Sequence, residues 1–133
     1  MEISVVIPSY NQPATVQRCI ASILEQDFDN EYEIIIVDSS EKSKQEALAA
    51  FCGPISRVQL ITLEKQTFPG SARNVGIKSA QGEIIALIDS DCVAQPNWLK
   101  NIQQNMESGV ILTGVIENGT EDSVYGTCSF LVE

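Results

Sequence analysis

Three aspartates, each placed after an apolar run, are the residues of this chain best suited to chemistry. Asp38 follows the run 33–37, and Asp89 and Asp91, with Ser90 between them, follow the run 83–88. Carboxylates that converge repel one another unless a cation or a hydrogen-bonding ligand lies among them. Mg²⁺ and Mn²⁺ prefer oxygen ligands, often one or two carboxylates together with phosphate oxygens and water. The alternative is that each aspartate only caps the loop that follows it.

The elements around these aspartates are predicted to alternate between strands and helices. Apolar, β-prone runs predict strands at 3–7 (ended by Pro8), 33–37, 83–88 and 110–116, and an alternating pattern predicts a strand at 58–63. Helical spacing and capping signals predict helices at 13–24, 43–52, 70–80 and 96–107, and Thr120 offers a cap for a helix in the tail 120–133. This alternation predicts one α/β domain over residues 1–133, with a mostly parallel sheet between two helical layers.

An open parallel sheet binds its ligands beyond the carboxyl ends of the strands, near the point where the strand order reverses. The first strand is followed by Ser9, Tyr10 and Asn11, the second ends at Asp38, and the fourth ends at Asp89. We therefore expect these residues to project toward one edge of the sheet, where a ligand would bind.

The composition narrows the classes of partner. The chain has 133 residues, 44% of them hydrophobic and 20% charged, with a formal net charge of −10. That charge argues against a nucleic acid polymer or an anionic membrane as the main partner, and a phosphorylated ligand would need a cation to bridge it to the protein. No apolar run approaches the ~20 residues of a transmembrane helix, and the amino terminus lacks a signal-peptide pattern. A cytoplasmic protein is expected.

Two further groups of residues have simple interpretations. Cysteines stand at positions 19, 52, 92 and 128 without a Cys-x-x-Cys pair, and the chain has no histidine. Buried reduced thiols are therefore expected rather than a zinc site. The acidic residues between positions 25 and 33 are expected to form a solvated turn (Glu25, Asp27, Asp29, Glu31 and Glu33).

Four segments, in order along the chain, resemble the family 2 glycosyltransferases of GT-A fold. They are 3–11 (ISVVIPSYN), 34–39 (IIIVDS), 70–80 (GSARNVGIKSA) and 82–98 (GEIIALIDSDCVAQPNW), and the likeness runs to about residue 116. The resemblance implies a Rossmann-like GT-A domain that binds a nucleotide-diphosphate sugar, with a UDP-sugar preferred. It also implies metal-dependent transfer of the sugar to an acceptor hydroxyl, with inversion at the anomeric centre.

The resemblance assigns the nucleoside part of the site to the first two strand ends. Pro8 and Tyr10 match residues that line the base pocket, and Ser9 between them is counted with the nucleotide-sugar contacts. Tyr10 would stack on uracil; otherwise it is a rim aromatic packed on the sheet edge. Asp38 matches the acid that accepts hydrogen bonds from the nucleoside, since a carboxylate is an acceptor only.

The diphosphate part is assigned to the helix 70–80 and to the motif 89–91. Arg73 matches an arginine near the diphosphate, and a surface ion pair is its alternative role. Asp91 matches the metal ligand, for Mn²⁺ or Mg²⁺, and Asp89 would contact the ribose or the metal through its bound water. Ser90 stands where many family members have an acid, and it is counted with the nucleotide-sugar contacts.

The acceptor half of such an enzyme, with its general base, is expected to lie beyond this chain. Glu117, Glu121 and Asp122 are the acids near its end, and none is assigned as the base. A non-catalytic nucleotide-diphosphate-binding module or fragment is the alternative function. The run 85–93 also resembles the motif of phosphatases that use an aspartate nucleophile. In those enzymes the motif lies on the first strand, whereas here it begins in the fourth predicted strand. The acceptor is expected to be a glycan or another molecule with a free hydroxyl. The chain is also expected to associate with the inner face of a membrane and to form a homo-oligomer through apolar surface.

Overall fold

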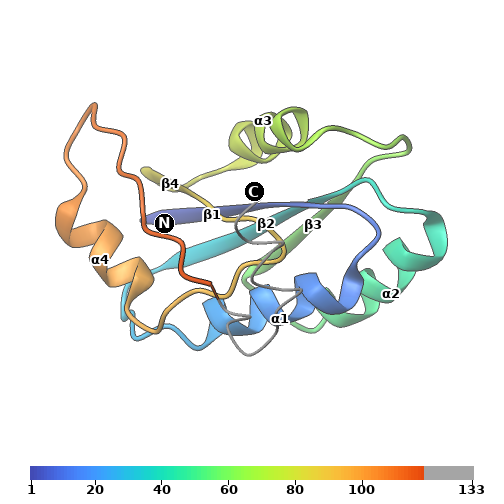
Figure 1. Ribbon diagram of the computed structural model, residues 1–133, viewed down its shortest axis with the longest axis horizontal. Coiled ribbons are helices and arrows are strands. Elements are labelled where there is room, and N and C mark those ends of the chain that lie inside the picture. Colours follow the sequence, from blue (N-terminus) through green and yellow to red (C-terminus); the bar gives the residue numbers. More distant parts are fainter. Residues whose placement is uncertain (119–133) are drawn as a thin grey trace.

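The structure, a computed structural model, describes residues 1–118 and alternates strictly between strands and helices (Figure 1). The elements are β1 (Ile3–Ser9), α1 (Pro13–Leu24), β2 (Tyr32–Asp38), α2 (Lys42–Cys52), β3 (Val58–Thr62), α3 (Pro69–Ser79), β4 (Ile84–Leu87) and α4 (Trp98–Asn105).

The four strands form one parallel sheet in the order β3-β2-β1-β4. After β1 the chain adds β2 and β3 on one side, and it then crosses to the other side to add β4. The strand order therefore reverses at β1, and the crevice at its carboxyl end is where this architecture places ligands. In register, Ser9 of β1 lies opposite Asp38 of β2.

Helices cover both faces of the sheet, as the sequence predicts. In Figure 1, α1, α2 and α4 lie below the sheet and α3 lies above it. Successive residues of a strand face opposite sides, so Val5 and Ile7 pack toward α1 while Val6 packs toward α3. Both layers are closed by fully buried aliphatic side chains, each of which stabilises the fold by roughly 1.5–3 kcal/mol. The three-layer α/β/α prediction is confirmed.

Helix α3 approaches the sheet closely at a glycine. A Cβ added at Gly76 would lie 2.4 Å from Val6 Cγ1 and 3.3 Å from Val37 Cγ2. The missing side chain lets the helix backbone rest on the two valines. Because Arg73 lies one turn earlier in α3, this contact also fixes its height above the sheet.

Strand β1 continues two residues past its predicted end, through Pro8 to Ser9. The carbonyl groups of Glu2, just before β1, and of Val6, within it, face β4: Glu2 O accepts from Ile84 N (3.0 Å) and Val6 O from Ile88 N (3.3 Å). Pro8 lies two residues after Val6, so its backbone also faces the β4 side, but the β1–β4 pairing ends at Val6. Pro8 has no N–H to donate toward β4, which fits the end of the β1–β4 pairing at Val6, while the pairing with β2 continues to Ser9.

The predicted strand at 110–116 is wrong, because the segment has no strand conformation. Within residues 1–118 it joins no sheet, and Ile111 and Val115 are 91% and 92% exposed. An apolar run becomes a strand only where a neighbour pairs with its backbone and a core covers one face. Gly109, with φ +79°, does turn the chain as predicted.

The remaining boundaries differ slightly from those predicted. Helix α4 begins at Trp98, two residues after Pro96, and ends at Asn105. The predicted tail helix, with Thr120, lies outside the described residues. None of the helices within residues 1–118 has the length and apolar character needed to cross a membrane.

Candidate functional site at the carboxyl edge of the sheet

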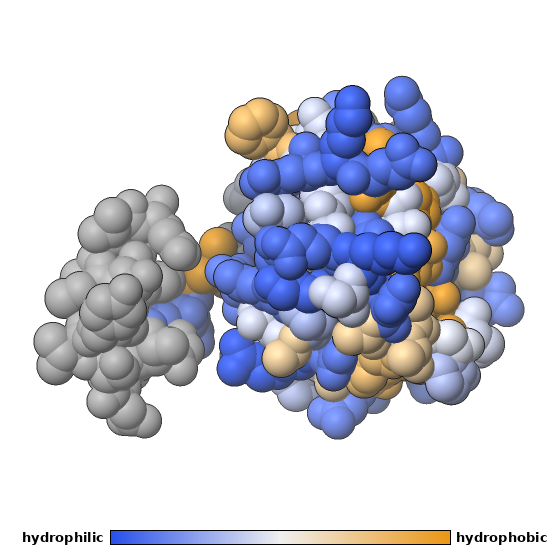
Figure 2. Space-filling view, turned by 90° about the vertical axis from the view of Figure 1, so that its right-hand side faces the viewer, coloured by the Kyte–Doolittle hydropathy of each residue, from blue (hydrophilic) through white to orange (hydrophobic). Residues whose placement is uncertain are grey.

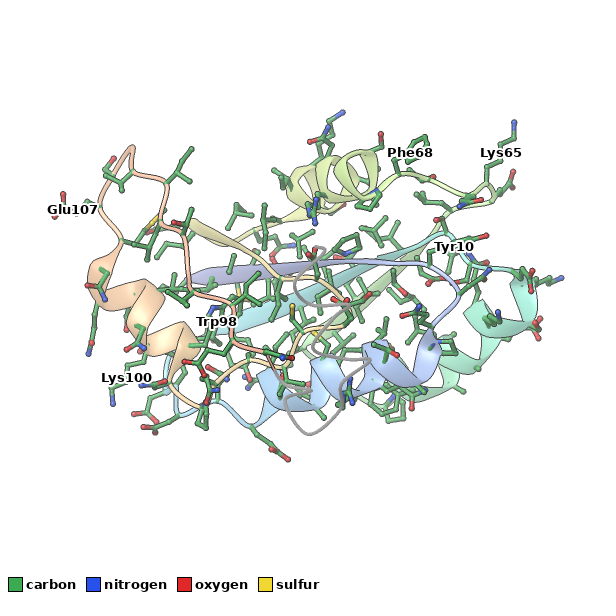
Figure 3. All side chains as sticks on the ribbon, viewed as in Figure 1. Tyr10, Lys65, Phe68, Trp98, Lys100 and Glu107 are labelled. Carbon is green, nitrogen blue, oxygen red and sulfur yellow. The ribbon has the colours of Figure 1, made fainter. Side chains whose placement is uncertain are left out.

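The carboxyl edge brings together most of the residues predicted for the site. Pro8 and Ser9 are buried at the end of β1, Tyr10 follows them and is 42% exposed, and Asp38 ends β2. Figure 2 looks onto this edge, whose surface is mostly hydrophilic. In Figure 3, Tyr10, Lys65 and Phe68 lie at this end, whereas Trp98, Lys100 and Glu107 lie at the other.

Asp38 is the centre of a buried hydrogen-bond cluster. Its side chain is 1% exposed. Oδ1 accepts hydrogen bonds from the hydroxyls of Ser9 and Ser40, both at 2.7 Å, and Oδ2 accepts one from the backbone N–H of Ser40 at 3.1 Å. A carboxylate has about four acceptor positions. Three are used, so one position on Oδ2 remains for a further donor.

The same cluster ties three loops together. The backbone N–H of Ser39 donates to Ser9 O (3.1 Å), and the Ser39 hydroxyl accepts from Thr67 N (3.0 Å). The Gln45 side-chain amide donates to Asp38 O (3.2 Å) and to Leu63 O (3.0 Å). The loops after β1, β2 and β3 therefore hold one another in place. Sequence reasoning missed these contacts, although two consecutive serines after a strand-ending aspartate were a usable signal.

Arg73 and Asp89 bring α3 and the end of β4 together. The Arg73 guanidinium donates from Nη2 to Asp89 Oδ1 in an ion pair, with the side chains 30% and 54% exposed. Pairs this exposed contribute about 0–1 kcal/mol to stability. Arg73 has five N–H donors in a planar fork, so the ion pair leaves donors for an anionic ligand.

The motif 89–91 forms a turn just after β4, so its acids are not held in straight strand geometry. The turn is closed by a hydrogen bond from Cys92 N to Asp89 O at 3.0 Å. Asp91 is exposed, and the thiol of Cys92 lies 3.8 Å from its Oδ1. Ser90 is half-buried between the two acids.

The thiols of Cys19 and Cys92 both contact this turn. The thiol of Cys19, on α1, lies 3.6 Å from Asp89 O, the same carbonyl that accepts from Cys92 N. Burial raises the pKa of Cys19 to about 12, and Cys92, Asp91 and Asp89 add to the rise. Burial also raises the pKa of Cys92. Both thiols are therefore neutral near pH 7. Cys19 and Cys52 are buried and unpaired as predicted, Cys92 is half-buried, and Cys128 lies outside the described residues.

The three aspartates do not form one metal-binding cluster. Within residues 1–118 no group of three or more acidic, cysteine or histidine side chains is arranged to hold a metal ion. Asp38 is turned into its serine cluster, and one oxygen of Asp89 pairs with Arg73. The exposed carboxylate of Asp91 fits a different donor set, in which a divalent cation takes its other ligands from phosphate and water.

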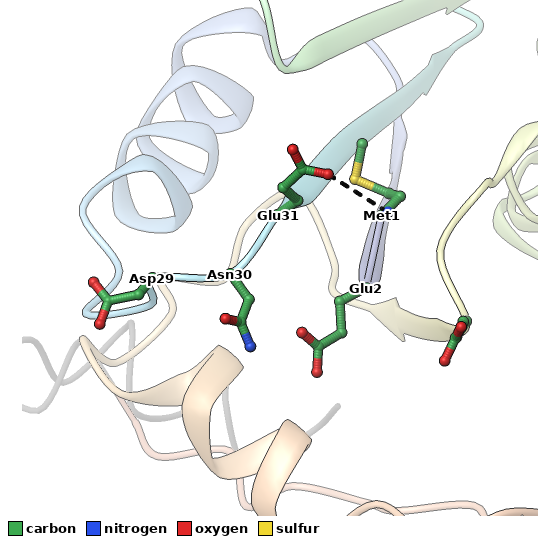
Figure 4. A pocket seen from close by; sticks show the side chains of 6 residues that line it. Met1, Glu2, Asp29, Asn30 and Glu31 are labelled. Atoms are coloured by element: carbon green, nitrogen blue, oxygen red, sulfur yellow. Dashed lines mark ion pairs between the residues drawn. The ribbon is translucent and has the colours of Figure 1, made fainter.

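The opposite end of the sheet has an open acidic hollow (Figure 4). It is lined by Met1, Glu2, Asp29, Asn30, Glu31 and Glu83, and the amino terminus lies 3.6 Å from Glu31. Four of the five acids predicted to form a solvated turn are exposed, and two of these, Asp29 and Glu31, line the hollow; Glu33 is half-buried. Its Oε1 accepts from the Ser4 hydroxyl (2.6 Å) and from Gln81 N (2.8 Å), so Glu33 joins β1 and β2 to the entry of β4.

Of the three acids considered as a general base, only Glu117 lies within the described residues. Glu117 is exposed. Glu121 and Asp122 lie outside that range, so the structure places neither of them.

Comparison with known families matches residues 4–130 to the family described as glycosyl transferase family 2. Glycosyltransferase AglE of Haloferax volcanii is 30% identical over 115 residues, which are 84% of this chain and 38% of that protein. The chain thus spans well under half the length of this relative.

Solved structures share the fold. S. aureus TarS 1-349, in complex with UDP-GlcNAc, superposes with a TM-score of 0.70 and 26% identity, over 91% of this chain and 38% of that one. The mannosyltransferase PcManGT of Pyrobaculum calidifontis, in complex with GDP-Man and Mn²⁺, has a TM-score of 0.70 and 23% identity, over 77% and 31%.

Proposed function

This chain belongs to glycosyl transferase family 2, and on that premise we propose that its carboxyl edge binds the nucleotide-diphosphate sugar of a sugar-transfer reaction. The donor is a UDP-sugar, and the sugar passes to a hydroxyl of a glycan or other acceptor with inversion of the anomeric centre. The observation that carries the proposal is the gathering of Tyr10, Asp38, Arg73 and the turn 89–91 at the carboxyl ends of β1, β2 and β4, around the reversal of strand order.

The nucleoside is assigned to the side formed by β1 and β2. Tyr10 offers an exposed aromatic face on which a base can stack. The remaining acceptor position on Asp38 suits the N–H of a uracil, and the serine hydroxyls hold the carboxylate in one orientation. The complex of TarS with UDP-GlcNAc supports a UDP-sugar, since that chain has the same fold and 26% identity over 91% of this one.

The diphosphate is assigned to the side formed by α3 and β4. Arg73 can keep its ion pair with Asp89 and direct its other N–H groups at phosphate oxygens. Arg73 is already paired with Asp89, Asp91 adds a further negative charge, and the whole chain has a charge of −10. An anionic diphosphate therefore needs additional positive charge to bind here.

A divalent cation, Mn²⁺ or Mg²⁺, would be held by Asp91, with Asp89 contributing directly or through water. When bound, such a cation supplies charge stabilisation to the leaving diphosphate. PcManGT supports the pairing of this fold with a metal, because its structure holds GDP-Man together with Mn²⁺. The protein's own contribution is to hold the Asp91 carboxylate in a turn braced by Cys19 and Cys92.

The deciding experiment measures UDP binding by calorimetry, with Mn²⁺ and with EDTA, for the wild type, Asp91→Ala and the control Glu46→Ala. Glu46 is an exposed acid on α2, so its removal changes the net charge by the same amount at a distant position. We expect Mn²⁺-dependent UDP binding in the wild type and the control and none in Asp91→Ala. Equal UDP affinity with Mn²⁺ and with EDTA would refute the metal-dependent site.

A further inference from the structure

The turn after β1 and the turn after β2 are fastened to each other by reciprocal hydrogen bonds. The backbone N–H of Asn11 donates to the hydroxyl oxygen of Ser40 at 2.6 Å. In return, the side-chain oxygen of Asn11 accepts from the backbone N–H of Glu41 at 3.1 Å. We call this pair of contacts the Asn11–Ser40 clasp. It joins two segments that lie 29 residues apart, immediately beyond the paired residues Ser9 and Asp38.

Asn11 has a backbone conformation that needs such support. Its φ is +53°, and among residues 1–118 it is the only residue other than glycine with a positive φ. This left-handed region costs an L-residue roughly 1–2 kcal/mol, with Asn among the residues that adopt it most readily. The conformation turns the chain sharply from β1 into α1 directly after Tyr10, so the direction in which Tyr10 leaves the sheet depends on it.

Ser40 connects the clasp to the Asp38 carboxylate. Its hydroxyl donates to Asp38 Oδ1 at 2.7 Å while it accepts from Asn11 N, so the three groups form a chain from N–H to hydroxyl to carboxylate. A carboxylate at the end of such a chain polarises the hydroxyl and strengthens the bond that the hydroxyl accepts. Ser40 is 8% exposed, so water competes little for these contacts.

We propose that Asn11 and Ser40 are positioning residues of the nucleoside site. The clasp holds Tyr10 at the angle at which its ring receives the base, and it holds Asp38 with its unused acceptor position toward the base edge. Neither residue needs to touch the ligand, because each acts through its neighbour. The inference rests on the proposed function, since it assigns Tyr10 and Asp38 to the nucleoside.

The test compares four variants at these two positions, and one control variant, with the wild type by calorimetry, at a temperature below the thermal midpoint of each. Ser40→Ala removes the hydroxyl, and Ser40→Thr keeps it. Asn11→Ala loses both the acceptor oxygen and the ease of positive φ, and Asn11→Asp keeps both. Ser43→Ala is the control, because Ser43 is an exposed serine three residues further along the chain. The probes are uridine, UDP with Mn²⁺, and pyrophosphate with Mn²⁺.

We expect Ser40→Ala and Asn11→Ala to weaken uridine and UDP by about tenfold, which corresponds to one lost positioning contact of about 1.4 kcal/mol. Ser40→Thr, Asn11→Asp and Ser43→Ala should stay within about threefold of the wild type. Pyrophosphate binding should be unchanged throughout, because the diphosphate side does not depend on the clasp. A general loss of structure would instead weaken all three probes.

Two results would overturn the clasp's role. One is uridine binding at wild-type strength in folded Ser40→Ala and Asn11→Ala, and the other is an equal loss of uridine and pyrophosphate binding. A wild-type chain that binds neither uridine nor UDP would overturn the proposed function as well, and that outcome is visible before any variant is measured.

Discussion

Replacement of Asp38 is the sharpest test of the buried cluster at the carboxyl edge. Asp38→Ala removes the acceptor of three hydrogen bonds, from the Ser9 hydroxyl, the Ser40 hydroxyl and Ser40 N. A hydrogen bond to a charged group has a net value of about 1.5–3 kcal/mol. The sum is offset because removal of the carboxylate also removes its desolvation cost and frees two hydroxyls to rotate. We therefore expect a loss of about 3 kcal/mol in the free energy of unfolding.

That loss can be converted into a thermal shift. A domain of 133 residues has an unfolding entropy of about 0.28 kcal/mol/K at about 2.1 cal/mol/K per residue. A loss of about 3 kcal/mol then lowers Tm by about 10 °C. Asp38→Asn retains the oxygen that accepts from both hydroxyls and loses only the bond from Ser40 N. Its Tm should fall by about half as much.

The assay is thermal unfolding followed by circular dichroism, together with calorimetric titration of uridine into the folded proteins. Uridine should bind Asp38→Ala more weakly by about 1.5–3 kcal/mol, because the nucleoside loses a charged acceptor. A Tm for Asp38→Ala within about 2 °C of the wild type would refute the cluster as a stabilising centre. Equal shifts for Ala and Asn would show that charge, rather than acceptor geometry, is what matters. Unchanged uridine affinity would refute the assignment of Asp38 to the nucleoside.

Two further predictions concern packing and pH. Gly76→Ala places a methyl 2.4 Å from Val6 Cγ1. Overpacking costs about 1–3 kcal/mol and Ala favours a helix by ~1 kcal/mol, so a net loss of up to about 2 kcal/mol should lower the urea midpoint. A raised midpoint would mean that α3 does not rest on β1. Burial raises the pKa of Cys19 from 9.0 to about 12. The fold therefore favours the neutral thiol, so that its contribution to stability is complete below pH 9 and is lost as the pH rises toward 12. Scanning calorimetry from pH 8 to 11 should show a smaller fall of Tm in Cys19→Ala than in the wild type, and parallel curves would contradict this account.

Most of the architecture could be predicted because the two central strands, β1 and β2, are buried on both faces. Runs such as 3–7 and 33–37 have no polar alternation, which is the pattern of a parallel strand between two helical layers. Once the strands are parallel, their carboxyl ends must meet at one edge, so the positions of Asp38 and Asp89 followed without knowledge of any contact. The family resemblance added Arg73, which no hydrophobic pattern would have selected.

The errors have equally specific causes. The run 110–116 has the composition of a strand, but composition does not supply the neighbouring backbone that a strand must pair with. Pro8 was expected to end β1, because the sequence did not reveal that the pairing with β2 continues to Ser9 after the pairing with β4 ends at Val6. The Asp38 cluster was missed for a different reason: a sequence does not show which way a strand-ending carboxylate turns, although the two serines that follow Asp38 were a usable signal.

The strand order β3-β2-β1-β4 also determines when each pair of strands can form during synthesis of the chain. Ile3 of β1 pairs with Tyr32 of β2 and with Ile84 of β4, so its second partner is made 52 residues after its first. At about 5–20 residues per second of synthesis, this gap lasts roughly 3–10 s. During that interval β1 has one paired side and one open side, and the open edge of a hydrophobic strand is prone to association with other chains. The half of the rim that carries Ser9 and Asp38 can therefore fold before the half that carries Asp89 has been synthesised.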